Sequence, residues 1–560
     1  MNVGTHFPFA SRTVSKLTGR WARRIYLAIL FLLLIISTAT RLRSYFMARK
    51  IEAVLHGLGE IHLDAIAGMI APHAINGRQH PAGIGMRENR RQPPERARFP
   101  RIVDKIDFPK PVDLSALSWA DAFAALHNTL IREYPFTAWR RIDWPGLYDN
   151  YRARVVDAEQ HKNVDAFRHA VRGYVYSIPD GHMYVHGPFD DLRRREIGGG
   201  FGFAVAPLDD GRVVCFLVVD GSPAAKAGLT PGAEISSLGG KSIEDAALAV
   251  STLWTRKPVS TSIQRRKEQF RYLSRAPVGT SVEIAFRKRS ENAITKIIVT
   301  AADDHYEYLQ RSQPPGPVQE QRRLLTHKVL DSGLGYIAVF GEDPEIVTEF
   351  ENVLREMIDR KVPALILDIR QNPGGEDETA ARIVSYFHNQ KSLYEYAQYF
   401  NTDTGTFDVL RSGTLYVTPR QPHFAGPVIA LIGSNTGSSG EGIAMEIARA
   451  PHGQTLGFDG TAGYFGMSGG SAKLPEQVVV GFPIGTSLGK RGWIQIDSDY
   501  RGTGGVLPQI RVPRTYENVL AVGRGEDVEL QAAEQELLKA ISKKKGLARK
   551  PVSSEGLKSR

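Results

Sequence analysis

Two glycine-containing turns in the C-terminal half of the chain, one of which is also rich in serine, have the composition of a nucleophile site. The turn at residues 433–440 (GSNTGSSG) follows an apolar run and precedes a helical pattern. A serine in such a turn can lie at a helix N-terminus, where backbone N–H groups stabilise a developing oxyanion. The turn at residues 372–375 (NPGG) also follows an apolar run, and paired glycines allow a ligand to approach the backbone closely. The residues alone also fit two ordinary tight turns.

One histidine has the context of a general base. His182 closes the polar segment SIPDGH after a predicted helix, and the other histidines lack a comparable setting. The chain contains no H-E-x-x-H motif and no carboxylate cluster at metal-ligand spacing. We therefore disfavour a metallopeptidase and expect no metal and no cofactor.

The elements that must position the two turns have an α/β pattern. Strands are predicted at 335–340, 364–368 and 428–432, alternating with helices at 344–359, 376–388 and 441–450. Loops that follow strands of one sheet tend to lie at the same edge, which would bring the turns together. We predict an α/β core with a mixed sheet at residues 320–515.

The rest of the chain divides into segments of different pattern, because 560 residues require more than one core. The predicted fold class is α+β multidomain. We expect a linker at 41–111, a helical domain at 112–190, a β domain at 195–305, and a helix with a basic tail at 516–560. Within the β domain, Cys215 lies in a predicted buried strand, and residues 255–276 are expected to form a helical insertion.

The N-terminal segment predicts export. Residues 25–36 are continuously apolar and follow several basic residues, which indicates a signal peptide or membrane anchor at 1–40. A cleaved signal peptide is favoured, and an anchor that associates with the membrane through residues 25–40 stays open. Both alternatives predict an exported protein, periplasmic or anchored outside the cytoplasm. The net charge of +11 comes partly from ends and linkers, and the chain has no nucleic-acid-binding motif, so no nucleic acid is expected as a partner.

These segments together resemble the tail-specific (C-terminal processing) serine protease family over roughly residues 115–515. The D-x-R-x-N-P-G-G match at 368–375 is the most specific. Further matches are Tyr134-Pro135-Phe136 with Ile142-Asp143-Trp144, Asp180-Gly181-His182, the nucleophile motif at 436–441 and a terminal element at 502–512. The resemblance implies an exported serine endopeptidase that cleaves polypeptides through an acyl-enzyme.

The resemblance also assigns site residues. It places the nucleophile on Ser438 rather than on Ser434 or Ser439. The oxyanion hole would use the Ser439 N–H together with that of Gly374 or Gly375.

The predicted identity of the general base follows from a position at which this sequence departs from the family's pattern. The position of the family's general-base lysine holds Gly463, which favours the branch that resembles the tricorn core protease and retinoid-binding homologues. In that branch His182 takes the serine proton. Arg501 stands where the branch often has a glutamate. We therefore predict that Asp499 orients the imidazole, with Asp497 and Asp180 as alternatives, and Lys473 remains an alternative base.

Residues 195–305 resemble a bacterial PDZ domain. In this resemblance the loop GFGF binds a peptide C-terminal carboxylate, and the peptide adds a strand to an exposed sheet edge. The predicted peptide-binding residues are Gly200, Phe201, Gly202 and Phe203. Without the resemblance, the two phenylalanines are ordinary core aromatics. Expected partners are polypeptides recognised through exposed C-termini or unfolded segments.

Two other functions fit the same sequence. A catalytically weak or inactive peptide-binding homologue would keep the fold and the groove, because Gly463 and Arg501 permit a loss of catalytic geometry. A carrier related to the retinoid-binding homologues would instead bind apolar small molecules.

Overall fold

The computed structural model describes residues 99–289, 291–319 and 323–548. The predicted signal peptide or anchor at 1–40, and the predicted linker up to residue 98, lie outside these ranges. Within the described ranges, no helix combines the length and apolar character needed to cross a membrane.

The predicted α/β segment forms a six-stranded sheet, which we call the core sheet. Strand β13 is antiparallel to β14, and the remaining neighbours are parallel. The strand order is β13 (Leu325–Val329), β14 (Gly335–Val339), β15 (Leu365–Asp368), β18 (Val428–Leu431), β19 (Gly453–Gly457) and β22 (Ile510–Arg511). The sheet is therefore mixed, as predicted.

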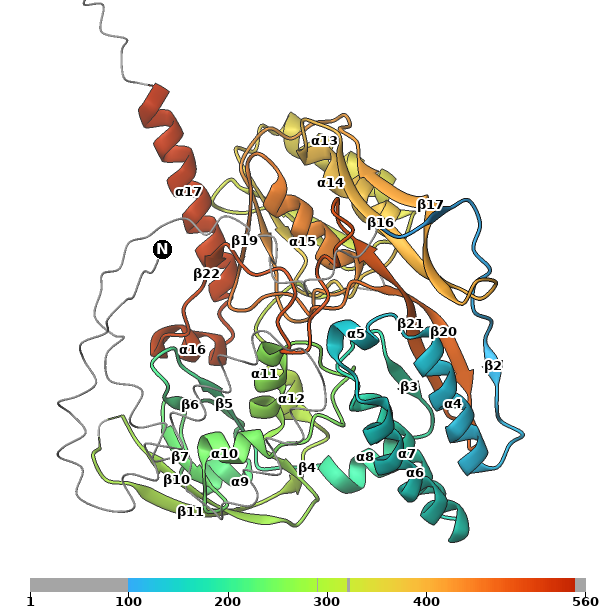
Figure 1. Ribbon diagram of the computed structural model, residues 1–560. Helices are drawn as coiled ribbons and strands as arrows, with labels where there is room; N and C mark the ends of the chain where they lie inside the picture. The colour runs from blue at the N-terminus through green and yellow to red at the C-terminus, as the bar shows by residue number, and fades with distance from the viewer. Residues whose placement is uncertain (1–98, 290, 320–322, 549–560) are drawn as a thin grey trace, which may run out of the picture. The chain divides into compact units, whose positions relative to one another are not determined.

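Helices cover both faces of the core sheet (Figure 1). One face packs against α13 (Ile346–Asp359), α14 (Asp377–Val384) and α15 (Ser439–Arg449). The other face packs against α16 (Tyr516–Gly523) and α17 (Val528–Ala548). Because alternate side chains of β14, β15 and β18 enter these two clusters, the strands are apolar on both faces.

A second sheet, the hairpin sheet, carries long antiparallel strands. Its main strands are β16 (Ser392–Asn401), β17 (Thr406–Val417), β20 (Met467–Lys473) and β21 (Val479–Leu488). Three short strands from the N-terminal part join it: β1 (Ile102–Val103) pairs with β17, β2 (Val112–Asp113) with β20, and β3 (Tyr184–His186) with β21. The segment predicted as a linker therefore contains a strand, β1, that pairs with a strand about 300 residues later.

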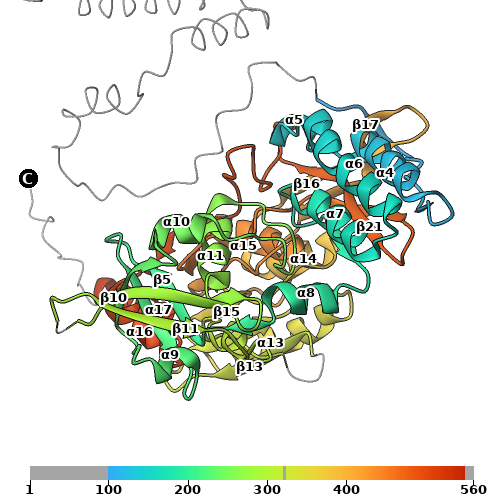
Figure 2. The same ribbon diagram turned by 90° about the horizontal axis from the view of Figure 1, so that it is seen from below.

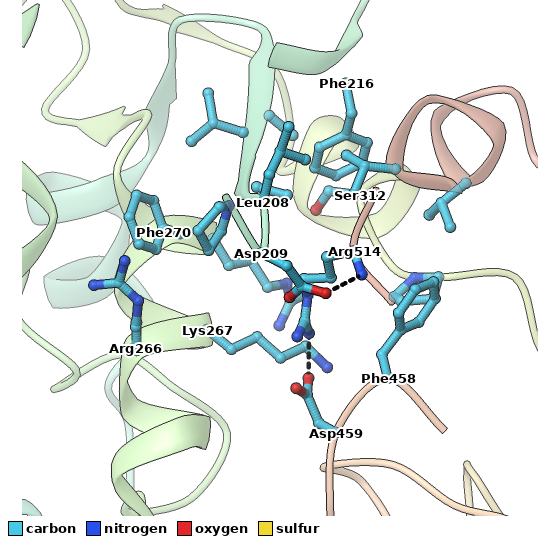
Figure 3. Close-up of a pocket in the computed structure, with 18 of the residues that line it drawn as sticks. Leu208, Asp209, Phe216, Arg266, Lys267, Phe270, Ser312, Phe458, Asp459 and Arg514 are labelled. Atoms are coloured by element: carbon cyan, nitrogen blue, oxygen red, sulfur yellow. Dashed lines mark hydrogen bonds and ion pairs between the residues drawn. The ribbon is translucent and has the colours of Figure 1, made fainter. Parts of the chain in front are cut away.

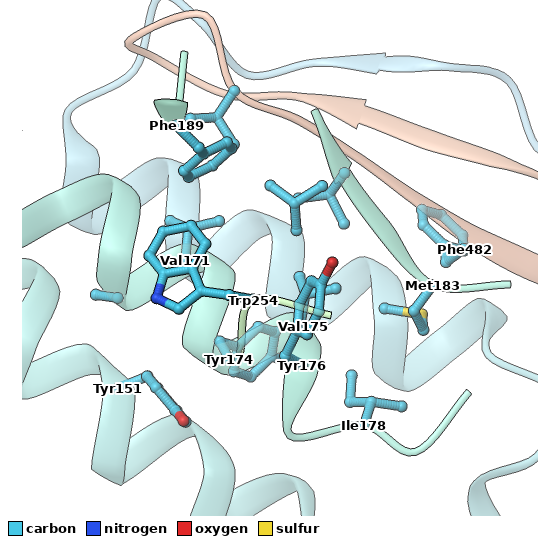
Figure 4. Packing of buried hydrophobic residues seen from close by; sticks show 14 of the residues in the cluster. Tyr151, Val171, Tyr174, Val175, Tyr176, Ile178, Met183, Phe189, Trp254 and Phe482 are labelled. Atoms are coloured by element: carbon cyan, nitrogen blue, oxygen red, sulfur yellow. The ribbon is translucent and has the colours of Figure 1, made fainter. Parts of the chain in front are cut away.

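The N-terminal helices pack on this hairpin sheet. They are α4 (Trp119–Glu133), α5 (Thr137–Arg140), α6 (Trp144–Gln160) and α7 (Val164–Tyr176). Figure 4 shows Val171 and Val175 of α7 with Phe482 of β21 in one buried cluster. The helical segment thus shares its hydrophobic core with β21, about 300 residues later in the chain. Helical spacing in the sequence cannot reveal this contact.

A third, antiparallel sheet lies between the helices and the core sheet in sequence. Its order is β11 (Thr295–Thr300), β10 (Ser281–Arg287), β7 (Glu234–Leu238), β6 (Val213–Val218) and β5 (Phe203–Pro207), and β8 (Lys241–Ser242) pairs with β7. The expected helical insertion contains α11 (Ser262–Tyr272), which Figure 2 shows together with α10 (Ile243–Leu248) on this sheet. Cys215 lies fully buried in β6, as predicted. Strand β5 is an edge strand.

The remaining short elements connect these layers. Three two-residue strands, β4 (Gly199–Gly200), β9 (Arg275–Ala276) and β12 (Ala302–Asp303), form a small sheet. The other helices of the described ranges are α8 (Asp190–Ile197), α9 (Pro223–Lys226), α12 (Glu307–Arg311) and the 3-10 turn Ser385–Phe387.

Arg370 fixes the end of β15 to the start of α17. Its guanidinium lies 2.6 Å from Asp368, 2.7 Å from Asp527 and 3.1 Å from Glu529. Arg370 is 5% exposed and Asp368 is fully buried, so removal of the cation leaves a carboxylate without its partner in a dry environment.

We expect Arg370→Met to lower the free energy of unfolding by about 3–5 kcal/mol, because a broken buried ion pair leaves an uncompensated charge. The matched control is Arg355→Met, which removes an exposed pair with Glu351 and should cost less than about 1 kcal/mol. Urea unfolding followed by circular dichroism measures both. If both variants lose the same free energy of unfolding, the ion pairs of Arg370 do not stabilise the contact between β15 and α17.

Candidate functional site

Ser438 lies where the loop after β18 enters α15. Its backbone φ is 52°, a left-handed value that is strained for a residue with a Cβ, and α15 begins at the next residue. The Ser438 N–H donates to the carbonyl oxygen of Tyr464 at 3.0 Å, which holds the strained turn. The half-buried Ser438 hydroxyl therefore sits at a helix N-terminus, as the turn composition predicted.

His182 meets this serine from the loop that follows α7. Its Nε2 lies 3.1 Å from Ser438 Oγ, and the two residues are 256 positions apart in the chain. His182 is only 8% exposed. The structure thus brings the two predicted residues to a distance at which a proton can pass between them. We refer to them as the Ser438–His182 pair.

A buried network holds the His182 loop. One carboxylate oxygen of Asp180 accepts a hydrogen bond from the backbone N–H of His182 at 2.9 Å. The other oxygen accepts one from the Tyr134 hydroxyl at 2.9 Å. Arg140 lies 3.6 Å from the same carboxylate and also donates to the carbonyl oxygen of Pro179. Because Tyr134 ends α4 and Arg140 lies in α5, the N-terminal helices position the histidine through this network.

The surroundings favour a neutral imidazole. Burial lowers the pKa of His182 to about 4, Asp180 opposes this shift, and the Lys257 and Arg140 cations add to it. At neutral pH the ring is therefore uncharged. With its proton on Nδ1, Nε2 is free to accept a proton from Ser438.

The group that orients His182 is not the predicted one. Nδ1 of His182 is buried without a hydrogen-bond partner among the described residues. Asp499 instead binds the Arg501 side chain at 2.9 Å and accepts the Thr503 N–H at 3.1 Å. The predicted Asp499–His182 bond is therefore wrong for this structure, because the nearby Arg501 cation and its own loop occupy the carboxylate.

The other sequence candidates also have partners of their own. Asp497 accepts the Phe465 N–H at 2.9 Å, and Asp180 belongs to the network under the loop backbone. Lys473 lies on β20 with its ammonium 3.4 Å from Asp113. Within the described ranges, neither Asp497 nor Lys473 makes a hydrogen bond with the Ser438–His182 pair.

The paired-glycine turn lies beside the serine. Gly374 has a φ of 105°, and a Cβ there would lie 2.5 Å from Ser438 Cβ, so only glycine permits this approach. The Gly374 N–H donates to Asn372 Oδ1 at 2.9 Å, and the Gly375 N–H donates to Ser439 Oγ at 2.6 Å. Both glycine donors predicted for the oxyanion hole therefore already have acceptors, Gly374 within its own turn and Gly375 on the first residue of α15. Ser439 N–H is the first of α15, a position without an intrahelical acceptor.

Two buried glutamates fix the turn and the helix start. Glu342 accepts the Asn372 amide N–H at 2.6 Å and the Ser439 hydroxyl at 2.9 Å. Glu441, the last residue of the nucleophile motif, accepts the Tyr464 N–H at 2.9 Å. Burial raises the pKa of each glutamate to about 7 against the opposing effect of these hydrogen bonds. The glutamate of the motif thus connects α15 to the loop at Tyr464.

Two residues at the site were not predicted. The Tyr464 ring meets the His182 ring edge-on with the centroids 4.9 Å apart, and the Tyr464 hydroxyl accepts a hydrogen bond from Lys257 Nζ at 3.2 Å. Burial lowers the pKa of Lys257 to about 8, and Arg256 adds to this shift. Lys257 lies in the predicted insertion, and no motif spacing connects it with the residues that it contacts.

A separate cavity of about 290 Å³ lies along β5, α11 and α16 (Figure 3). Figure 3 shows Leu208, Phe216 and Phe270 around it. It also shows Arg514, whose backbone N–H donates to Asp209 and whose guanidinium donates to Asp459. The lining is largely apolar, and one side of it is the open edge of the antiparallel sheet. This arrangement suits an extended apolar chain.

The predicted peptide-binding residues do not line this cavity, which begins at Ala204. Phe201 and Phe203 are 3% and 0% exposed in the core of the antiparallel sheet, so the interpretation as core aromatics holds. Gly200 is paired within β4, and the Gly202 carbonyl oxygen accepts the Val219 N–H at 2.9 Å. The loop backbone is thus occupied by internal hydrogen bonds.

The site as a whole brings together a serine hydroxyl, a neutral imidazole and a helix N-terminus. In the part of the chain that the structure describes, no three His, Cys, Asp or Glu side chains are grouped so as to hold a metal ion. The arrangement can carry out attack of a hydroxyl on a carbonyl group.

Comparison with known proteins identifies the region that contains the serine. Residues 333–512 match Peptidase family S41. The chain is 22% identical over 315 residues to the carboxy-terminal processing protease CtpB of Bacillus subtilis (strain 168), covering 56% of this chain and 55% of that protein. It is 20% identical over 345 residues to CtpA of the same organism, covering 61% and 63%. The match thus spans less than two thirds of either relative.

Among solved structures, mature CPAF shares the fold. Its TM-score is 0.55 at 13% sequence identity, with 76% of this chain and 98% of that chain covered. Residues 333–512 of this chain form a peptidase family S41 domain that is homologous to those of the carboxy-terminal processing proteases.

Proposed function

We propose that the protein is a serine endopeptidase that cleaves polypeptides through an acyl-enzyme. The observation that carries this proposal is the 3.1 Å contact between His182 Nε2 and Ser438 Oγ at the N-terminus of α15. The S41 domain supports it, because the named relatives are processing proteases. An inactive peptide-binding homologue would not require a neutral buried base in contact with a strained serine.

In the proposed mechanism, Ser438 Oγ attacks the scissile carbonyl carbon while His182 Nε2 takes its proton. The Ser439 N–H and the positive end of α15 stabilise the tetrahedral oxyanion. The imidazolium then gives the proton to the leaving amine, and water, deprotonated by the same imidazole, releases the acyl group from Ser438. Gly374 becomes a second donor when its N–H leaves Asn372 for the oxyanion.

We expect a fluorophosphonate probe to label the protein on Ser438. Ser438→Ala should abolish labelling, and His182→Ala should slow it by about 10³-fold or more, because the serine loses its base. The matched control is His186→Ala, an exposed histidine on β3 that should label like the unmodified protein. Mass spectrometry of the labelled peptide measures the site. Labelling of a different serine, or undiminished labelling of Ser438→Ala, contradicts the proposed nucleophile.

We expect the labelling rate to stay high well below pH 6.5 and to fall near pH 4. Protonation of His182 removes the base, and burial has lowered its pKa from 6.5 to about 4. The free energy of unfolding changes in the same direction. The unfolded chain, in which His182 has its ordinary pKa of 6.5, binds a proton at higher pH than the folded chain, so stability is lost as the pH falls from 6.5 to about 4. Circular dichroism at each pH separates loss of the base from unfolding. An acid limb near 6.5 would show that the imidazole is not buried.

We propose further that the cavity beside β5 binds polypeptide in the manner of a PDZ domain. A peptide there would add a strand to the open edge of β5, with its side chains against α11. The apolar lining supports recognition of apolar chain ends or unfolded segments, which is the substrate class that we propose.

We expect Ile263→Asp to raise KM for an unfolded polypeptide about tenfold or more without a large change in kcat, because a charge enters the apolar groove. Ile263 lies on α11, lines the cavity and is 49% exposed. The matched control is Ile298→Asp, at a 72% exposed position on β11 at the opposite edge of the same sheet. Steady-state proteolysis measures both constants. Equal effects of the two variants would argue against recognition in this cavity.

We also propose that the protein acts outside the cytoplasm. The apolar run at residues 25–36 and the basic residues before it support export, with retention at a membrane if residues 25–40 are not removed. An export reporter fused after residue 40 would test this proposal, and a reporter that stays in the cytoplasm would contradict it.

A further inference from the structure

We infer that Tyr464 and Lys257 are positioning residues that hold the Ser438 hydroxyl and the His182 imidazole at hydrogen-bonding distance. The inference rests on the proposed function, and it assigns a role to two side chains that the sequence motifs leave out. Both side chains lie against the loops that carry the pair.

Tyr464 lies between the loops that carry the pair. Its ring occupies the space that a Cβ of Gly181 or Gly437 would need, and these glycines directly precede His182 and Ser438. The ring meets His182 edge-on at 4.9 Å, and the Tyr464 carbonyl oxygen accepts the Ser438 N–H at 3.0 Å. One residue therefore touches both loops, so a shift of Tyr464 changes the distance from base to hydroxyl.

Lys257 holds the outer end of the ring. Its Nζ donates to the Tyr464 hydroxyl at 3.2 Å and lies 4.6 Å from the ring centroid. Three residues later, the Ser260 hydroxyl accepts the Gly181 N–H at 2.8 Å. The loop between α10 and α11 thus contributes to the site of the S41 domain, although in sequence it belongs to the antiparallel sheet.

The charge of Lys257 also acts on the base. The charged groups that influence His182 are Asp180, which favours the imidazolium, and Lys257 and Arg140, which disfavour it. Lys257 itself faces Arg256, Asp180 and Glu441. Loss of the Lys257 cation should therefore raise the pKa of His182, which a purely structural contact would not do.

The test is the rate of fluorophosphonate labelling of the full chain as a function of pH. We expect Tyr464→Ala to slow labelling about 100-fold, the size of effect that a displacement of about 1 Å produces, while Tyr464→Phe keeps the ring and loses less than about tenfold. Lys257→Met should slow labelling and move its acid limb to higher pH. Lys257→Arg keeps the cation and should restore the acid limb.

The matched control is Lys391→Met, which removes an exposed lysine 4.5 Å from the ring of Tyr416 and should leave both rate and acid limb unchanged. The unfolding midpoint of each variant shows that it is folded, and the comparison of Lys257→Met with Lys257→Arg decides the question if Tyr464→Ala unfolds.

The outcomes separate the two proposals. If the unmodified protein labels but Lys257→Met and Tyr464→Ala match it in rate and acid limb, the positioning inference is overturned and the proposed function stands. If the unmodified protein does not label at all, the proposed function fails, and with it the inference.

Discussion

The structure depends on one constraint: an imidazole and a hydroxyl that are 256 residues apart must meet at 3.1 Å. The serine is fixed by the core sheet, since β18 leads into its loop and α15 leads out of it. The histidine is fixed by the N-terminal helices on one side and by β3, which pairs with β21, on the other. The helices and the two sheets must therefore fold against one another before the pair exists.

Burial sets the chemistry of this pair. In water an imidazole is half protonated near its ordinary pKa of 6.5, but the dry position of His182 lowers that pKa to about 4 and keeps the ring neutral. Burial also raises the pKa of Glu342 and Glu441 to about 7. Glu342 accepts hydrogen bonds from the Asn372 amide and the Ser439 hydroxyl, and Glu441 accepts them from the Thr461 hydroxyl and the Tyr464 N–H. Their oxygens fix the glycine turn and the start of α15, so the groups around the serine are rigid rather than solvated.

The sequence predicted those parts of the molecule whose signal is local. Apolar runs and helical spacing located β14, β15, β18 and the helices between them, and glycine-rich turns after two of these strands located Ser438 and Gly374 at one sheet edge. The histidine followed from the polar turn after a helix. Each of these features depends on neighbours within a few residues.

The features that sequence could not predict depend on contacts between distant segments. Asp499 pairs with Arg501, a cation two residues away, and not with His182. Phe201 and Phe203 pack in the core of the antiparallel sheet and do not line a groove. The roles of Tyr464 and Lys257 come from the space beside Gly181 and Gly437, which no motif records. Pairing of β1, β2 and β3 with the hairpin-sheet strands β17, β20 and β21 likewise has no local signal.

The most direct measurement is a crystal structure of the protein after reaction with the fluorophosphonate. We predict phosphorus bonded to Ser438 Oγ, with the phosphoryl oxygen about 2.7–3.1 Å from the Ser439 N–H and His182 Nε2 facing a second oxygen of the adduct. An adduct on another residue, or a phosphoryl oxygen directed away from α15 with His182 displaced, would contradict the assignment of this site.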